Sequence, residues 1–451
     1  MSGPPSLPPL FAARMRAQLG DEAEAYFSAL ELPPVRGVRL NPRKPVKGLE
    51  ALVGGMGGPV PWWPGTGRYL PLDSPAGLNP LHEAGAYYLQ EPSAMAAVAV
   101  LAPRPGERVL DLCAAPGGKS TQIADCLKGN GLLVANEPVP GRARVLSRNL
   151  ERMGVANALV VSADPERLCG LWPLLFDAVL VDAPCSGEGM FRRHPETRAE
   201  WSAASAAGCA ARQSRILSCA CAMLRPGGRL VYSTCTLNRE ENEQAICRLL
   251  QHDPQLEAVP FSLALGGAEK VSAPDGTLRL YPHRIQGEGH FVAYLRKRGG
   301  VHGAAGLLPA ARSLQTPGLP LLDAYRGFAE RFSAALPAAN ACLGNELLSA
   351  PELPPLDGVR VLRAGVHLGC LKGKAFEPDH ALALALPQPL PLPALELDRE
   401  GALAYQRGET LPVPDAWKGY ALAAYHGLAL GFGKASGGQL KNHYPKGLRR
   451  P

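Results

Sequence analysis

The sequence lacks the features that mark several common classes of protein. It contains no run of about 18 apolar residues, so we expect no transmembrane helix. The first 20 residues, MSGPPSLPPLFAARMRAQLG, hold no apolar core of the signal-peptide type. The 11 cysteines form no CxxC pair, which argues against a zinc site or a disulfide framework. We therefore expect a cytoplasmic protein that binds no metal and contacts no membrane.

Neither sign of charge dominates the chain. Its net charge of +7 permits an anionic partner such as nucleic acid but does not require one. A length of 451 residues and a hydrophobic content of 46% allow several domains with sizeable cores. Composition therefore leaves the function open, and the motifs must decide it.

The hydrophobic pattern changes several times along the chain. The N-terminal part opens with an amphipathic helix predicted over Leu10–Leu30. Linkers are predicted at the Gly, Ala and Pro-rich Gly299–Pro320 and at the stiffer PQPLPLP, Pro387–Pro393. We predict four parts: a small mixed domain (1–95), an α/β domain (96–298), a linker with a first C-terminal domain (299–386) and a small β-rich domain (387–451).

The second part has the pattern of a parallel sheet. Five near-continuous apolar runs, RVLDLCAAP, GLLVANE, ALVVSAD, FDAVLVDAPC and GRLVYSTC, alternate with helical segments, and HFVAYLRKR follows as a last strand. This alternation is typical of βαβ units, with helices on both faces of a mostly parallel sheet. We predict a Rossmann-like α/β domain whose ligands bind outside the carboxyl ends of the strands.

The stretch DLCAAPGGKS (Asp111–Ser120) follows the first of these strands and opens a helix. Its small residues and paired glycines let the backbone approach a ligand, and the helix start offers free N–H groups. A Walker P-loop requires glycine where Cys113 stands, and no GxGxxG fingerprint is present. The loop therefore favours S-adenosylmethionine, whose carboxylate takes the place of a phosphate.

Two acids support a nucleoside cofactor. Glu137 ends the second strand, 20 residues after Gly117, which is a spacing that suits the hydroxyls of a ribose. Asp164 ends the third strand, where it can accept a hydrogen bond from an adenine amine. Each acid alone could be an ordinary helix cap, but together with the loop they favour the cofactor.

The next two strands both end in a cysteine. Asp182 and Cys185 follow the fourth strand, and Thr234 and Cys235 follow the fifth. The ends of neighbouring parallel strands meet at one edge of the sheet, so both thiols are expected beside the cofactor loop. The acid run Glu240–Glu243 is predicted to begin the next helix, with no part in the chemistry.

Two thiols beside a methyl donor suggest covalent chemistry on a pyrimidine. A thiolate that adds to C6 of cytosine makes C5 able to attack the methyl group, and elimination then frees the thiol. One cysteine would attack, the other would assist release, and Asp182 would hold or protonate the N3 edge of the base. The spacing alone does not say which cysteine attacks.

At this point the motifs resemble a known family. DLCAAPGGKS, VDAPCSGEGMFRRHPE and VYSTCTLNREENE, with the lead-in YLQEPSAM, are similar to the motifs of the Nop/Sun family of RNA cytosine-C5 methyltransferases. The form CSGEGMFRR resembles the RsmF-like bacterial branch. Residues 362–386 resemble that branch's first C-terminal domain, and residues 427–450 resemble its PUA-like RNA-binding domain.

The resemblance implies a class I methyltransferase fold and a role for each motif. Cys235 would be the nucleophile, and Cys185 would assist product release. Asp182 would face the cytosine and, with Glu137 and Asp164, complete the cofactor pocket. The loop residues expected to line that pocket are Cys113, Ala114, Ala115, Pro116, Gly117, Gly118 and Lys119.

The implied partner is ribosomal RNA or the small ribosomal subunit, carrying a cytosine that becomes 5-methylcytosine. Arg192 and Arg193 directly follow the first cysteine loop and are expected to hold phosphates near a flipped-out base. Lys434, Lys441 and Lys446 lie in a basic tail expected to dock RNA. A transfer-RNA methyltransferase and a non-catalytic RNA-binding assembly protein remain as alternatives.

Overall fold

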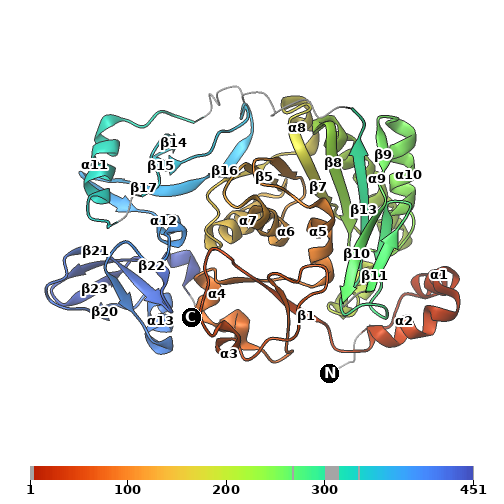
Figure 1. Cartoon of the computed structure of the whole chain (residues 1–451), viewed down its shortest axis with the longest axis horizontal. Coiled ribbons are helices and arrows are strands. Elements are labelled where there is room, and N and C mark those ends of the chain that lie inside the picture. The colour runs from red at the N-terminus through yellow and green to blue at the C-terminus, as the bar shows by residue number, and fades with distance from the viewer. Residues whose placement is uncertain (1–4, 267–268, 300–313, 334–335, 450–451) are drawn as a thin grey trace.

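A nine-stranded sheet forms the centre of the computed structural model, which describes residues 5–266, 269–299, 314–333 and 336–449 (Figure 1). Five of its strands are parallel and lie in the order β8-β7-β4-β5-β6. They are the five predicted apolar runs. Their bounds are β4 (Arg108–Asp111), β5 (Leu132–Asn136), β6 (Ala158–Ser162), β7 (Phe176–Asp182) and β8 (Leu224–Thr234).

Antiparallel strands close both sides of this parallel core. The predicted last strand is β13 (His290–Lys297), which pairs with β8 and in turn carries β12 (Thr277–Leu280) and β9 (Leu256–Ala258). On the opposite side β16 (Arg360–Ala364) pairs with β6, although it lies far outside the 96–298 segment. Neither outer parallel strand is therefore left with an open edge.

Helices cover both faces of the sheet, as predicted. Alternate strand residues point to opposite faces, so Val109 belongs to the apolar cluster that includes α5, α6 and α7, while Leu110 belongs to the cluster that includes α8, α9 and α10. This two-sided burial is why the strands are apolar along their whole length. The six helices are α5 (Ala96–Leu101), α6 (Gly118–Leu127), α7 (Pro140–Arg152), α8 (Pro165–Leu171), α9 (Ala203–Met223) and α10 (Glu243–His252).

The chain reverses its direction across the sheet at β4. β5 and β6 follow on one side of β4, and β7 and β8 follow on the other. Ligands of open α/β sheets bind at such a reversal, outside the carboxyl ends of the strands. The ends of β4 and β7, at Asp111 and Asp182, therefore mark the expected crevice.

The N-terminal part packs against this crevice edge. The helix predicted over Leu10–Leu30 is interrupted at Gly20, whose φ of +55° is left-handed and ends the first helix. Phe11 and Tyr26, one from each half, pack with Phe191 and Leu237 of the central domain. The elements are α1 (Pro9–Leu19), η1 (Gly20–Glu22), α2 (Ala23–Leu30), β1 (Arg36–Leu40), α3 (Leu49–Leu52), β2 (Gly67–Leu70), α4 (Pro80–Glu83) and β3 (Tyr87–Leu89).

Two small sheets follow the central one, and a short hairpin precedes the last of its strands. The predicted linker Gly299–Pro320 lies mostly at 300–313, outside the described residues. The elements are β10 (Phe261–Gly266), β11 (Glu269–Ala273), α11 (Leu319–Ala329), β14 (Ala341–Leu343), β15 (Glu346–Ser349), β17 (Val366–Lys372), β18 (Ala375–Pro378), α12 (His380–Ala385), β19 (Ala394–Glu396), α13 (Arg399–Arg407), β20 (Leu411–Pro412), β21 (Gly419–Tyr425), β22 (Leu428–Ser436) and β23 (Gln439–Asn442). The predicted β-rich character of the C-terminal part is confirmed.

Candidate active site

The loop after β4 turns sharply into α6. Gly117 has a φ of +112°, and a Cβ atom there would lie 3.2 Å from Leu146 Cδ1. Both the backbone and the space therefore require glycine. No side chain caps α6, so its first N–H groups are left for a ligand.

A pocket opens beside this loop. Six of the seven loop residues expected there line it, all except Gly117. Its other walls come from the end of β3 with the segment that follows, and from Asp182 after β7. The loop and the β7 end thus meet at one cavity, as the reversal of the chain at β4 requires.

Asp111 also lines this pocket, although the sequence patterns predicted no role for it. It is fully buried at the end of β4, where Oδ2 accepts a hydrogen bond of 2.6 Å from Ser120 Oγ. Its Oδ1 has no hydrogen-bond partner among the described residues. Burial raises the pKa of Asp111 to about 7. A cationic or N–H group of a ligand in the pocket would satisfy this atom.

The other two predicted cofactor acids lie at the ends of β5 and β6. Glu137 is buried and accepts a 3.0 Å hydrogen bond from the backbone N–H of Val139, with Arg142 3.4 Å away. Asp164 is exposed at the start of α8, where its side chain caps nothing. Neither residue lines the loop pocket itself. Both acids lie along the same edge of the sheet, beyond the walls of this pocket.

Asp182 lies between the cofactor loop and the end of β8. Oδ2 is 2.8 Å from Lys119 Nζ, and Oδ1 accepts a 2.8 Å hydrogen bond from Ser233. Desolvation opposes the ionisation of Asp182, but the charge of Lys119 with these hydrogen bonds outweighs it and lowers the pKa. Asp182 is therefore an ionised carboxylate paired with a lysine of the cofactor loop.

His290, the first residue of β13, is a site residue that the sequence did not suggest. It is buried, and its Nε2 lies 3.8 Å from Asp182 Oδ1 with no hydrogen-bond partner among the described residues. Burial and the neighbouring Lys119 charge lower the pKa of His290 to about 3. Next to Asp182 this imidazole is neutral.

The two cysteines lie side by side. Cys185 Sγ and Cys235 Sγ are 3.3 Å apart and share a hydrogen bond. Their strands place them there, because Asp182 of β7 is in register with Ser233 of β8. The hydrogen bond with Cys235 and burial together raise the pKa of Cys185 well above its usual range. Cys185 is therefore held as a protonated thiol next to the Cys235 sulfur.

Glu241 holds the two cysteine loops together. It is fully buried and comes from the acid run expected only to begin a helix. Its Oε2 accepts hydrogen bonds from the Ser186 backbone N–H (3.0 Å) and from Gln213 Nε2 (2.8 Å). Its Oε1 accepts from Ser186 Oγ and from Asn238 Nδ2. One carboxylate thus joins the residue after Cys185 to the segment after Cys235.

Of the rest of the acid run, Glu243 begins the next helix as predicted, whereas Glu240 lies in the turn before it. Glu240 is exposed, and α10 begins at Glu243, in the first turn of which a negative charge is favourable. The three acids look alike in the sequence, and the pattern contains no signal that one of them is buried. The signal that could have drawn attention to Glu241 is its nearness to the Thr-Cys motif.

The structure corrects the expectation for Arg192. Its side chain is buried, Nε lies 2.7 Å from Glu288 Oε2, and Nη2 donates to the carbonyl of Gly287 at 2.6 Å. This guanidinium is used inside the protein and is not free to hold a phosphate. Arg193 is half-buried beside the carbonyl of Val35 at 3.5 Å.

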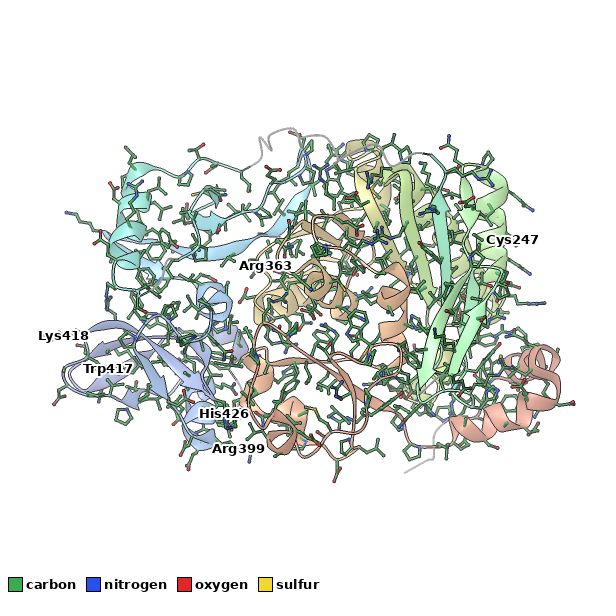
Figure 2. All side chains as sticks on the ribbon, in the orientation of Figure 1. Cys247, Arg363, Arg399, Trp417, Lys418 and His426 are labelled. Atoms are coloured by element: carbon green, nitrogen blue, oxygen red, sulfur yellow. The ribbon has the colours of Figure 1, made fainter. Side chains whose placement is uncertain are left out.

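The three C-terminal lysines are exposed. Lys434 of β22 and Lys441 of β23 are directly opposed across adjacent strands, so their side chains lie on one face. Lys434 Nζ is 5.8 Å from the ring centre of Tyr420 on β21. Lys418, labelled in Figure 2 at the outer end of the same sheet, is a further exposed cation. Lys446 lies in the short helical turn after β23.

Within the part of the chain that the structure describes, no group of three or more histidine, cysteine or acidic residues could hold a metal ion. None of the described helices is long and apolar enough to cross a membrane. The site therefore consists of two thiols, a lysine–aspartate pair, a neutral histidine and a glycine-rich loop.

Four family models match consecutive parts of the chain. Residues 7–92 match the N-terminal domain of 16S rRNA methyltransferase RsmF, and residues 98–296 match the 16S rRNA methyltransferase RsmB/F model. Residues 327–386 match the RsmF rRNA methyltransferase first C-terminal domain, and residues 392–450 match the methyltransferase RsmF PUA domain.

Individual proteins agree with these models. Ribosomal RNA small subunit methyltransferase F of Klebsiella pneumoniae (strain 342) is 35% identical, over 98% of this chain and 96% of its own length. A methyltransferase homologue from Pyrococcus horikoshii has a similar structure, with a TM-score of 0.54 and 32% identity over 64% of this chain and 94% of that chain. The crystal structure of NSun6 from Pyrococcus horikoshii with SFG shares the fold, with a TM-score of 0.57 at 23% identity over 65% and 99% of the two chains.

The buried hydrogen bonds of Glu241 to both cysteine loops yield a prediction about stability. Every group that faces this carboxylate is a donor, so Glu241→Gln turns an amide N–H₂ towards donors and leaves at least one of them unpaired. We expect the free energy of unfolding to fall by roughly 2 to 4 kcal/mol, measured by chemical denaturation. The matched control is Glu240→Gln, which changes an exposed neighbour and should leave stability unaltered. Equal stability of the two variants would contradict the claim that Glu241 holds the two cysteine loops together.

Proposed function

Because the chain belongs to the RsmF type of the RsmB/F family of 16S rRNA methyltransferases, we propose that Cys235 is the nucleophile of its reaction and Cys185 the residue that assists release. The family's reaction is the S-adenosylmethionine-dependent methylation of cytosine C5 in 16S rRNA. The observation that carries the proposal is the pair of sulfur atoms 3.3 Å apart at the ends of β7 and β8, beside the glycine-rich loop.

The pocket residues fit S-adenosylmethionine. The buried, unpartnered Oδ1 of Asp111 can accept from the ammonium group, and the free N–H groups at the start of α6 can bind the carboxylate. Glu137 would bind the ribose and Asp164 the adenine amine. When bound, this cofactor supplies an electrophilic methyl group on a sulfonium.

Cys235 would add to C6 of the flipped-out cytosine as a thiolate. The bond from Cys235 Sγ to C6 makes C5 electron-rich enough to take the methyl group. Asp182 would face the N3 edge of the base, and the proton that it shares with Lys119 would be donated to N3 and neutralise the negative charge that the addition creates. A base or water at the site then takes the C5 proton, the electron pair of the C5–H bond forms the C5–C6 double bond and expels Cys235 Sγ from C6, and Cys235 is regenerated as a thiolate.

The pKa of Cys185 favours this division of roles. A thiol whose pKa is raised by the neighbouring sulfur stays protonated, and in the proposed reaction Cys185 would be the donor of the hydrogen bond between the two sulfur atoms. Such a donor stabilises a thiolate at Cys235. Cys185 is then poised to exchange a proton at the stage when the adduct breaks down.

We further propose that the chain divides into the four predicted parts, with β16 of the third part completing the central sheet, and that residues 387–451 dock RNA through Lys434 and Lys441. The proposed partner is ribosomal RNA of the small subunit, and the proposed location is the cytoplasm. The family model names 16S rRNA, which favours this substrate over the transfer-RNA alternative. An intact pair of cysteines argues against the non-catalytic alternative.

The proposed roles of the two cysteines predict the fate of the covalent adduct. With 16S rRNA and S-adenosylmethionine, Cys185→Ala should form the adduct and fail to release it, so protein and RNA should migrate together under denaturing electrophoresis. Cys235→Ala should form no adduct, since the attacking sulfur is gone. Cys247→Ala is the control, because Cys247 is exposed on α10 away from the two loops and should behave as wild type (Figure 2). An adduct in Cys235→Ala instead of Cys185→Ala would reverse the roles.

The proposed docking of RNA on the C-terminal sheet predicts that loss of its lysine charges weakens RNA binding. Lys434→Gln with Lys441→Gln should weaken binding to 16S rRNA by roughly 3- to 10-fold and reduce the slope of log affinity against log salt by about 1 to 2. The affinity for S-adenosylmethionine should not change. A control with the same loss of charge is Lys128→Gln with Arg296→Gln. These two exposed cations belong to the central domain, at the end of its sheet that lies away from the two cysteines. Equal weakening by both double variants would remove the specific role of this sheet.

A further inference from the structure

A second cavity lies next to the Cys235 loop and is separate from the cofactor pocket. It has a volume of about 500 Å³ and lies between the N-terminal helix α1 and the segments that follow β8 and β12. The residues that matter in its wall are Arg14, Gln18, Asn238, Arg239, Arg279 and Arg284. None of them was singled out by the sequence patterns.

The cavity shares its wall with the catalytic loops. Asn238, which lines it, also donates hydrogen bonds to Ser186 Oγ (3.3 Å) and to Glu188 Oε1 (3.2 Å). Arg14 reaches from α1 to the same Glu188 at 2.6 Å. A ligand in this cavity would therefore lie against the segment that follows Cys235, which is hydrogen-bonded to the segment that follows Cys185.

Ion pairs occupy most of the charged groups of the cavity wall. Four arginines line it with two glutamates, Glu22 and Glu240. Arg284 is paired with Glu22, and Arg279 and Arg14 are paired with Glu243 and Glu188 just outside the lining. These ion pairs fix the wall and leave Arg239 as the arginine of the lining for which no ion pair is found among the described residues.

Arg239 is the arginine that remains available. It is exposed, and within the described residues its guanidinium takes part in no hydrogen bond or ion pair. It stands four positions after Cys235, at the rim of the cavity. By contrast Arg192, the residue expected to hold a phosphate here, is buried against Glu288.

We propose that this cavity binds the sugar and phosphate of a nucleotide next to the target cytosine, with Arg239 as the phosphate ligand. The inference rests on the proposed function. A base that enters the active site must leave its stack, so the backbone on either side of it passes close to the cysteine loops. A guanidinium recognises a phosphate through two parallel N–H donors. The amides of Gln18 and Asn238 can position the sugar.

The test uses the full chain with 16S rRNA, both naked and within small subunits, taken from cells that lack the gene. Arg239→Ala should raise KM for the RNA roughly ten-fold and lower the salt slope by about 1, because one charge-assisted contact is lost. At saturating RNA kcat should stay within about two-fold of wild type. Arg239→Lys should recover part of the loss, since lysine keeps the charge without the paired donors.

The control is Arg296→Ala, which removes an exposed arginine at the far end of β13. An unchanged KM and salt slope in Arg239→Ala would overturn the inference. So would a loss of stability or of S-adenosylmethionine affinity in that variant, because it would make Arg239 a structural residue. Wild-type protein that methylates neither substrate would instead contradict the proposed function, so the two failures are distinguishable.

Discussion

The arrangement of the catalytic centre depends on the buried carboxylate of Glu241. Two parallel strands bring Cys185 and Cys235 to the same edge of the sheet, but their loops leave the strands in irregular conformations. A charged group that is fully buried must be satisfied by hydrogen bonds, and Glu241 finds its donors on both loops. The hydrogen bonds of Glu241 therefore hold the two loops together and, with them, the sulfur atoms at their separation of 3.3 Å.

The same edge of the sheet keeps groups of different charge close together. Lys119 and Asp182 form an ion pair, while burial keeps His290 neutral and raises the pKa of Asp111 to about 7. The raised pKa of Cys185 follows from its hydrogen bond with Cys235 and from burial. Each group thus takes its protonation state from its neighbours, which is how one small site can hold a protonated thiol beside the proposed nucleophile.

Much of the fold and part of the site could be predicted from the sequence, because they follow from local patterns. Near-continuous apolar runs identified the strands, and the residues at their ends followed from the sheet topology, as Cys185 and Cys235 illustrate. Contacts between distant segments could not be predicted. Arg192 is neutralised by Glu288, 96 positions away, and His290 comes from an antiparallel strand with no motif. Glu241 lies in a turn, and its burial depends on a hydrogen bond from Gln213 of helix α9.

The most direct test of the central claim is a map of 5-methylcytosine in 16S rRNA by bisulfite sequencing. Cells with the gene, cells without it, and cells restored with wild-type or Cys235→Ala protein should be compared. The account predicts that a protected cytosine disappears when the gene is deleted, returns with the wild-type gene, and does not return with Cys235→Ala. An identical pattern of protected cytosines in all four strains would contradict the account.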